Sequence, residues 1–289
     1  MAEPATLRVA APAKLNLYLH VTGRRADGYH LLDSLVAFAD VGDAIEVGPA
    51  PSLSLAVKGP FAGDIPAGDD NLVLRAARLL AQGRGAAIVL EKNLPAASGI
   101  GGGSSDAAAT LQALSRLWDL RMAPEELDRL ALTLGADVPA CLRKAPLWLA
   151  GIGERLDAGP PLPPVDLVLV NPGLPLATPE VFRTFVASSA PFASTGRADV
   201  PLENVHVLAS FLRARRNDLE RVARFMAPPV DSALAALGAQ PGCLLARMSG
   251  SGATCFGLFV SRLAAERAVR QIKAAEPGWW SVPATWHHT

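Results

Sequence analysis

The sequence has no excess of charge of either sign. Among its 289 residues, lysine and arginine together number 27, and aspartate and glutamate also number 27, so the formal net charge is zero. A general nucleic-acid binder needs a basic excess that displaces counterions from phosphates. The composition therefore argues against nucleic acid as a partner and favours a small-molecule ligand, and no protein partner is inferred.

Cysteine is scarce. The chain has 3 cysteines, Cys141, Cys243 and Cys255, and no CxxC pair. An odd number of cysteines in apolar surroundings argues against a disulfide framework or a zinc ribbon. We interpret the three side chains as small buried hydrophobes in a reducing compartment.

Long hydrophobic runs are also missing, although half of the residues are hydrophobic. No stretch reaches the roughly 18 uninterrupted apolar residues of a membrane-spanning helix. Pro12, Lys14 and Asn16 interrupt the first apolar run, so the N-terminus lacks the core of a signal peptide. We expect a folded protein of the cytoplasm.

The length predicts two domains. The proline- and glycine-rich segment 158–164 marks the candidate boundary, which gives domains 1–158 and 159–289. We expect an α+β fold, with a mixed sheet, helices and the phosphate loop described below in the first domain and a smaller sheet-and-helix layer in the second. Strand patterns cover 15–21, 34–38, 44–47, 53–57, 86–90, 165–170, 243–248, 254–260 and 279–285. Helical patterns cover 71–82, 107–118, 124–134, 179–186, stretches up to 237, and 262–274, whereas 188–201 reads as a mobile loop.

A glycine-rich loop, Gly99–Ser105, lies between a short strand and a strong helix. Glycines let a ligand approach backbone amides, and amides at a helix N-terminus form an anion site. The alternative is a flexible turn in which Ser105 or Asp106 caps the helix. No lysine follows the glycines as in a Walker loop, Ser104 occupies the sixth position of a dinucleotide fingerprint, and no G-x-S-x-G elbow is present. We favour phosphate binding.

Phosphoryl transfer needs positioning, charge compensation and a group that receives the proton of the acceptor. Lys14 could supply the charge and Asp137 could receive the proton. The alternatives are an exposed lysine and a turn or cap aspartate. Lys14 shares a strand face with Asn16, opposite the aliphatic residues of 15–21, which weakens the first alternative. The segment Ser249–Gly252 is either a plain hairpin turn or a second set of amides at the site.

Three blocks resemble the GHMP kinase superfamily: the N-terminal strand block, the loop 95–105 and the glycine turn 249–254. The segment 12–34, PAKLNLYLHVTGRRADGYHLLDS, is similar to the branch that phosphorylates a cytidine diphosphate derivative of methylerythritol. The segments 135–139, 171–173, 178–182 and the pair Asn217-Asp218 also match. The resemblance covers nearly the whole chain.

The resemblance implies an ATP-dependent kinase of isoprenoid precursor synthesis that phosphorylates the 2-hydroxyl of the methylerythritol unit. Asp137 would be the general base and Lys14 its catalytic partner. The implied ATP-binding residues are Pro95, Ala96, Ala97, Ser98, Gly99, Ile100, Gly101, Gly102, Gly103, Ser104 and Ser105. The implied substrate-binding residues are Asn16, Tyr29, His30, Thr178 and Phe182, with Tyr29 and Phe182 stacking on the cytosine and His30 reading its edge.

Magnesium is expected with the nucleotide, but the resemblance names no protein ligand for it. Asp106 stands where many relatives carry Asn or Asp, and it would either help to hold magnesium or cap the helix.

Two other functions stay open. One is another GHMP kinase acting on homoserine or mevalonate, against which Gly28-Tyr29-His30 and Phe182 argue. The other is a non-catalytic nucleotide- or RNA-binding module, since fold does not fix function.

Overall fold

The computed structural model describes residues 6–66, 68–198 and 200–287. The chain forms two compact units, each assembled from separate stretches of sequence. The first unit comprises the residues up to Ala13, then Val41–Ala96 and Gly101–Lys144. The second comprises Lys14–Asp40, Ala97–Ile100 and Ala145–Thr289. Two long, mutually paired strands run through both units, β1 (Leu7–Arg24) and β2 (His30–Pro49).

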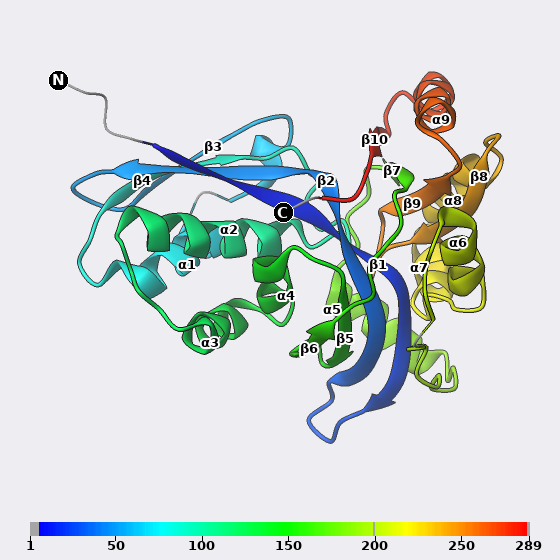
Figure 1. The fold of residues 1–289 in the computed structure, drawn as a ribbon, viewed down its shortest axis with the longest axis horizontal. Coiled ribbons are helices and arrows are strands. Elements are labelled where there is room, and N and C mark those ends of the chain that lie inside the picture. The colour runs from blue at the N-terminus through cyan, green and yellow to red at the C-terminus, as the bar shows by residue number, and fades with distance from the viewer. Residues whose placement is uncertain (1–5, 67, 199, 288–289) are drawn as a thin grey trace. The chain divides into compact units, whose positions relative to one another are not determined.

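The first unit places helices on one face of a sheet. Strand β4 pairs antiparallel with the end of β2 and parallel with β3. Helices α1 and α2 lie side by side beneath β3 and β4 (Figure 1). The further elements of this unit are β3 (Ser54–Lys58), the 3-10 helix η1 (Ala62–Asp64), α1 (Leu72–Ala81), β4 (Ala86–Glu91), α2 (Gly102–Leu117), α3 (Pro124–Leu134) and α4 (Val138–Arg143).

Local sequence explains where these helices begin. Asn71 is the N-cap of α1, and its side-chain oxygen accepts a hydrogen bond of 2.8 Å from the Val73 amide. Pro124 opens α3, and Glu125 and Glu126 follow in its first turn, where the helix dipole favours negative charge.

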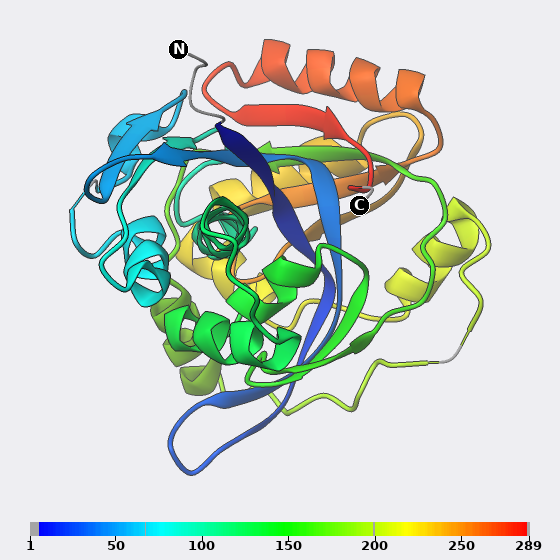
Figure 2. The same ribbon diagram turned by 60° about the vertical axis from the view of Figure 1, so that its left-hand side comes forward.

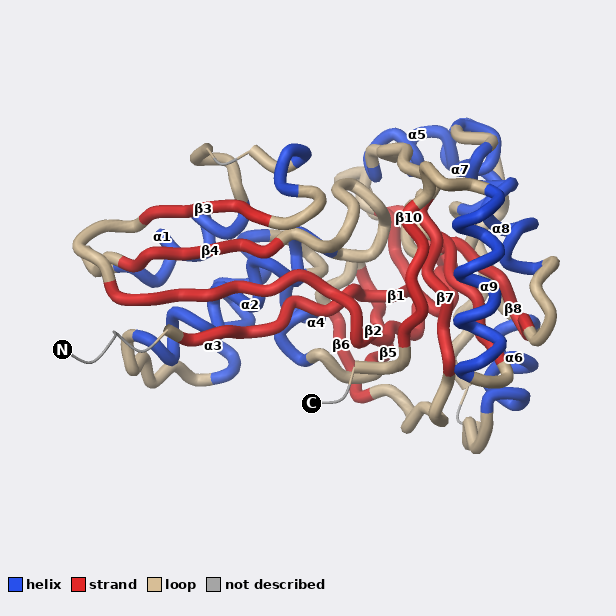
Figure 3. The backbone as a smooth tube through the Cα atoms, turned by 90° about the horizontal axis from the view of Figure 1, so that it is seen from above, coloured by secondary structure: helices blue, strands red, loops and turns tan. Residues whose placement is uncertain are grey.

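The second unit contains a four-stranded sheet in the order β10-β7-β9-β8, in which all pairs are antiparallel. Helix α9 lies along β10 in Figure 2 and beside β7 in Figure 3. The elements of this unit are β5 (Leu147–Gly151), β6 (Arg155–Ala158), β7 (Asp166–Asn171), α5 (Thr178–Ala187), α6 (Val205–Arg213), α7 (Glu220–Met226), α8 (Pro229–Gly238), β8 (Cys243–Met248), β9 (Cys255–Phe259), α9 (Arg262–Ala275) and β10 (Trp280–Ala284).

The core of the second unit joins this sheet to the helices around it. Val168, Val170 and Phe259 of the sheet pack with Val222 of α7 and Ile272 of α9. Strand β5 pairs antiparallel with the beginning of β2 and with β6, which extends the sheet to which β1 and β2 belong. None of the helices in the described ranges is long and apolar enough to cross a membrane.

The predicted α+β class is confirmed, and the structure corrects several predicted elements. Helix α2 begins at Gly102, five residues before the predicted start at residue 107, because the glycines of the loop already form its first turn. The short elements α4, β5 and β6 were not predicted, because four to six residues carry too little periodicity.

Residues 188–198 and 200–201 form neither helix nor strand, but they are held to the rest of the second unit. The Ala193 amide donates to Val21 O at 2.9 Å, and the Gly196 amide donates to the Asp33 carboxylate at 2.6 Å. A side chain at Gly196 would lie 2.9 Å from the Tyr18 ring and 3.0 Å from that of His20, so only glycine fits this close approach.

Candidate functional site

The glycine-rich loop leads directly into helix α2. Gly101 is the N-cap, with a left-handed φ of 65°, and the Ser105 amide donates to Gly101 O at 2.8 Å. The amides of Gly102, Gly103 and Ser104 precede this first helical hydrogen bond and have no acceptor within the helix. They form an arrangement suited to an anion, and phosphate binding by this loop stays a prediction.

The alternative cap is wrong, because Ser105 and Asp106 lie inside the helix. The Ser105 hydroxyl donates to Pro12 O at 2.7 Å and is buried. Backbone amides and the half-buried Ser104 side chain are therefore better placed than the Ser105 hydroxyl to meet a phosphate.

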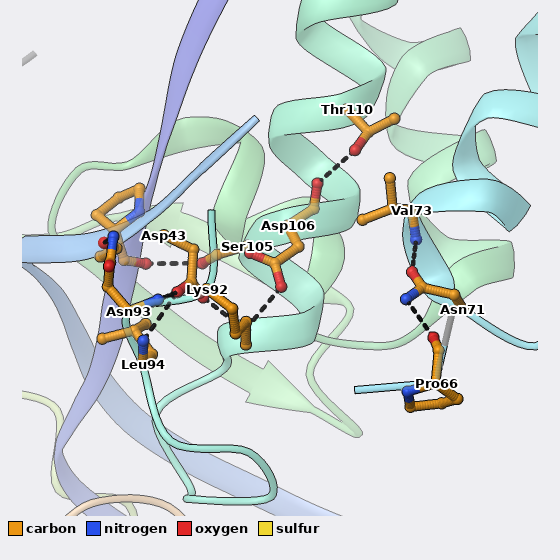
Figure 4. Close-up of polar contacts among 12 residues, drawn as sticks. Asp43, Pro66, Asn71, Val73, Lys92, Asn93, Leu94, Ser105, Asp106 and Thr110 are labelled. Carbon is orange, nitrogen blue, oxygen red and sulfur yellow. Dashed lines mark hydrogen bonds and ion pairs between the residues drawn. The ribbon is translucent and has the colours of Figure 1, made fainter. Parts of the chain in front are cut away.

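A buried charge cluster, made of Lys92, Asp43 and Asp106, lies at the start of α2. Lys92 Nζ is 2.5 Å from Asp43 Oδ2 and 2.7 Å from Asp106 Oδ2 (Figure 4). No side chain in this charge cluster is more than 4% exposed. One cation faces two carboxylates, so the cluster carries a net negative charge when all three groups are ionised.

The charge cluster ties strand β4 to helix α2. The other oxygen of Asp43, Oδ1, accepts from the amides of Asn93 at 2.6 Å and Leu94 at 2.8 Å. A side chain at Gly102 would lie 3.1 Å from Lys92 Nζ, so glycine there lets the loop backbone approach the cation. The cluster therefore sets where the loop enters its helix.

Burial shapes the protonation of this cluster. It raises the pKa of Asp106 to about 7, with Lys92 opposing the rise and Asp43 adding to it. For Lys92, burial acts to lower the pKa, but the carboxylates of Asp106 and Asp43 outweigh it and raise the pKa above the ordinary value. Asp106 Oδ1 is buried and has no hydrogen-bond partner among the described residues.

The Asp106 carboxyl predicts a pH dependence of stability. Its pKa is raised in the folded chain, so between its ordinary value and about 7 the folded state binds a proton that the unfolded state has released. Stability from this group is therefore full at low pH and is lost as the pH rises through that window. Asp106→Asn should remove this fall, as measured by urea unfolding between pH 4.5 and pH 8, values chosen to bracket the titration.

Asp69→Asn is the matched control for this prediction. Asp69 pairs with Arg78 and its side chain is 87% exposed, so the same substitution is made there at a solvated carboxylate. Its pH profile should follow that of the unaltered protein. Parallel profiles for Asp106→Asn and the unaltered protein would contradict the prediction.

In the second unit, the glycine turn Ser249–Gly252 lies against the loop segment 97–100. The Thr254 amide donates to Ser98 O at 3.0 Å, and the Ser249 hydroxyl donates to Gly99 O at 3.1 Å. A side chain at Gly99 would lie 2.6 Å from Gly252 N, and Gly99 has a left-handed φ of 74°. The turn is thus a hairpin connection between β8 and β9 that also supports the loop.

Further residues hold this turn. Asn217 Nδ2 donates to Met248 O at 2.9 Å and to Gly250 O at 2.8 Å. The hydroxyls of Thr178, at the start of α5, and Ser251 lie 2.8 Å apart. The predicted substrate residue Thr178 therefore adjoins the glycine turn.

Lys14 and Asn16 lie on β1 and are 4% and 3% exposed, which excludes the exposed-lysine alternative. The Lys14 amide donates to Ile100 O at 2.9 Å, and the Asn16 amide donates to the Ser249 hydroxyl at 3.1 Å. The backbone of this strand is thereby joined to both the loop segment 97–100 and the glycine turn.

The predicted base-binding residues surround the connection between β1 and β2. Tyr29 precedes β2 and is 61% exposed. His30 opens β2, and its ring stacks on Phe182 of α5 at a centroid distance of 4.9 Å and an angle of 20°. Burial, helped by the positive charge of Arg24, lowers the pKa of His30 and favours the neutral ring. Its Nε2 is buried without a hydrogen-bond partner among the described residues, which suits a group that reads a ligand.

Asp137 belongs to the first unit, where it is the N-cap residue of α4 and half-buried. Its backbone oxygen accepts from the Cys141 amide at 3.2 Å, but its side chain makes no capping hydrogen bond. The carboxylate therefore does not cap α4, and the interpretation of Asp137 as a cap is wrong.

Sequence reasoning missed two features of the site. The Lys92 and Asp43 pair could have been noticed as opposite charges at the ends of apolar strand patterns, although nothing in the sequence says that they meet. Ser34, whose hydroxyl accepts from Asn16 Nδ2 at 2.8 Å, lies at the end of the matching segment 12–34, but no pattern marks it as a residue of the site. Within the described ranges no group of three or more His, Cys, Asp or Glu side chains could hold a metal ion.

Two family models match the chain, "GHMP kinases N terminal domain" over residues 71–144 and "GHMP kinases C terminal" over residues 202–278. The predicted boundary at 158 falls between these ranges and stays a prediction.

Similar proteins agree over nearly the full length. A protein of Paramagnetospirillum magneticum named 4-diphosphocytidyl-2-C-methyl-D-erythritol kinase is 53% identical over 96% of this chain and 97% of its own length. One of the same name from Cereibacter sphaeroides is 56% identical over 95% of this chain and 97% of its own.

Among solved structures, a 4-(cytidine 5'-diphospho)-2C-methyl-D-erythritol kinase aligns with a TM-score of 0.78 and 36% identity, covering 98% of this chain and 100% of its own. A homoserine kinase from Cytophaga hutchinsonii aligns with a TM-score of 0.72 and 17% identity, covering 99% of this chain and 96% of its own, and this likeness shows the fold alone.

Proposed function

The chain belongs to the family of the 4-diphosphocytidyl-2-C-methyl-D-erythritol kinases within the GHMP kinases, and from this membership we propose the reaction it performs. It transfers the γ-phosphoryl group of ATP to the 2-hydroxyl of 4-diphosphocytidyl-2-C-methyl-D-erythritol, in the non-mevalonate synthesis of isoprenoid precursors. The observation that carries the proposal is identity above 50% over at least 95% of the chain to proteins of this name. A cytoplasmic location stays a prediction.

We propose that Asp137 and Lys14 are the catalytic residues. The Asp137 carboxylate receives the proton of the 2-hydroxyl, the oxygen forms a bond to the γ-phosphorus, and the bond to the leaving ADP oxygen breaks. Lys14 stabilises the negative charge that develops on the transferred group. A tertiary alcohol is a hindered nucleophile, so alignment contributes as much as proton removal.

The glycine-rich loop would hold the triphosphate. Support comes from the amides of Gly102, Gly103 and Ser104, which have no acceptor within helix α2. We propose that Mg²⁺ arrives with ATP and is held mainly by phosphate oxygens. Asp106 Oδ2 pairs with Lys92 at 2.7 Å and the side chain is 4% exposed, so we propose no direct contact between Asp106 and the metal.

The acceptor's cytosine would lie between Tyr29 and Phe182. His30 stacks on Phe182 at a centroid distance of 4.9 Å, so the residue that would read the edge of the base lies beside one that would stack on it. The buried Nε2 of His30 would then find its partner on the edge of the base. Recognition of this kind rejects other bases, since a wrong edge leaves buried polar groups unpaired.

An assay of ADP release with a panel of acceptors tests the proposed function. We expect turnover with the cytidyl acceptor and none with mevalonate or homoserine. Turnover with either of those alcohols, and none with the cytidyl acceptor, would assign the chain to another activity of the superfamily. Binding of ATP without ADP release from any acceptor would favour a non-catalytic nucleotide-binding protein.

Tyr29→Ala should weaken binding of the cytidyl acceptor. Stacking of a base on an aromatic ring contributes about 1–3 kcal/mol, so we expect the KM for the acceptor to rise about tenfold or more while the KM for ATP stays the same. Steady-state kinetics with each substrate varied in turn measures both constants. An unaltered KM for the acceptor would count against stacking.

Phe225→Ala is the matched control for Tyr29→Ala. Phe225 is an aromatic side chain of α7, 83% exposed, with no predicted role in substrate binding. Its removal should leave both KM values unchanged.

A further inference from the structure

The side chain of Asn16 is held by Ser34, a buried residue of β2 that the predicted site does not include. Asn16 Nδ2 donates to Ser34 Oγ at 2.8 Å, and Ser34 Oγ lies 2.5 Å from Tyr18 O. Ser34 is 0% exposed.

The proton of Ser34 decides which way the Asn16 amide points. Two oxygens 2.5 Å apart need a hydrogen between them, so the single hydroxyl proton of Ser34 is directed at Tyr18 O. The hydroxyl oxygen can then only accept. It accepts from the nitrogen end of the Asn16 amide and would repel the oxygen end.

The oxygen end of Asn16 is consequently turned toward the glycine turn. A side chain at Gly250 would lie 3.5 Å from Asn16 Oδ1 and 2.6 Å from Gly99 O, so glycine keeps this side of the amide open. The Asn16 backbone amide is held separately, by the Ser249 hydroxyl. Asn16 thus presents a fixed hydrogen-bond acceptor.

We infer that Ser34 is a positioning residue that fixes the Asn16 amide with its oxygen toward the acceptor alcohol, so that Asn16 accepts a hydrogen bond from a hydroxyl of that substrate. The inference rests on the proposed function and on the predicted place of Asn16 among the residues that bind the acceptor. It assigns to Asn16 Oδ1 the recognition of a hydroxyl donor rather than of a phosphate oxygen, since a carbonyl oxygen can only accept a hydrogen bond.

The test is a double-mutant cycle of Asn16→Ala and Ser34→Ala, with acceptor and ATP varied separately. Ser34→Ala frees the amide to rotate, and we expect kcat/KM for the acceptor to fall about tenfold with the KM for ATP unchanged, the effect of about one hydrogen bond. Because Ser34 acts through Asn16, adding Ser34→Ala to Asn16→Ala should cause no further loss.

Two further variants keep the test decisive. Ser34→Thr retains the hydroxyl and should keep the kinetics of the unaltered protein even if Ser34→Ala folds poorly. Thr22→Ala is the matched control, because it removes a hydroxyl of β1 that donates to Leu31 O at 3.3 Å without touching Asn16. It should change neither substrate's constants.

Additive losses in the double mutant, an equal rise in the KM for ATP, or Ser34→Thr as impaired as Ser34→Ala would each overturn the inference. Failure of the proposed function has a different signature, since the unaltered protein would then show no turnover with the cytidyl acceptor. Normal turnover by the unaltered protein combined with normal kinetics of Ser34→Ala would overturn the inference alone.

Discussion

Asp137→Asn should lower kcat by about 10²- to 10⁴-fold, the usual contribution of a positioned general base. The amide keeps the size of the side chain but cannot receive the proton of the acceptor alcohol. ATP affinity should be nearly unchanged, because the proposed role of the carboxylate is on the acceptor and not on the nucleotide. Steady-state kinetics at saturating substrates gives kcat, and equilibrium titration with ATP gives the affinity.

Asp128→Asn is the control for this experiment. Asp128 lies in α3, in the same unit as Asp137, and pairs with Arg143 at 2.7 Å on the surface. The same chemical change there should leave kcat intact. If Asp137→Asn lost ATP binding as strongly as turnover, Asp137 would be a structural residue and not the base.

Among these variants, Lys92→Met should lower the free energy of unfolding most. The substitution keeps the length of the side chain but leaves Asp43 and Asp106 buried against each other without a cation. Removing one partner of a buried ion pair costs about 3–5 kcal/mol, because the remaining charge is uncompensated. Urea unfolding at pH 8, above the value of about 7 to which burial raises the pKa of Asp106, measures this loss.

Two companion variants locate the cause of that loss. Lys58→Met removes a lysine whose side chain is 54% exposed beside Glu91, and it should change stability little. Adding Asp106→Asn to Lys92→Met removes one of the two stranded carboxylates and should restore part of the stability. A loss for Lys92→Met no greater than for Lys58→Met would mean that the buried charge cluster does not hold the loop.

The longer elements of the fold were predictable because their periodicity and caps are local. Asn71 caps α1 as predicted, and Pro124 opens α3. The sequence pattern predicts too late a start for α2 because glycine has a low helix propensity, whereas the left-handed Gly101 allows the helix to begin within the loop. Tertiary contacts override propensity at this position.

The site was predictable only where residues near in sequence act together. The glycine-rich loop and the turn 249–252 each stand out as short glycine-rich segments, and their contact through Ser249 and Gly99 follows from the fold. Ser34 and Asn16 lie on different strands, and no local pattern reports a hydrogen bond across 18 residues. The three residues of the charge cluster are likewise distant in sequence, so no local pattern predicts that they meet.

The most direct test of the account is a crystal structure of the chain with the cytidyl acceptor and a non-hydrolysable ATP analogue. We predict that the amides of Gly102, Gly103 and Ser104 bind phosphate oxygens, and that Lys14 and Asp137 both lie within hydrogen-bonding reach of the transfer site at the 2-hydroxyl. A complex in which the triphosphate lies away from the glycine-rich loop, or in which either side chain points away from that hydroxyl, would contradict it.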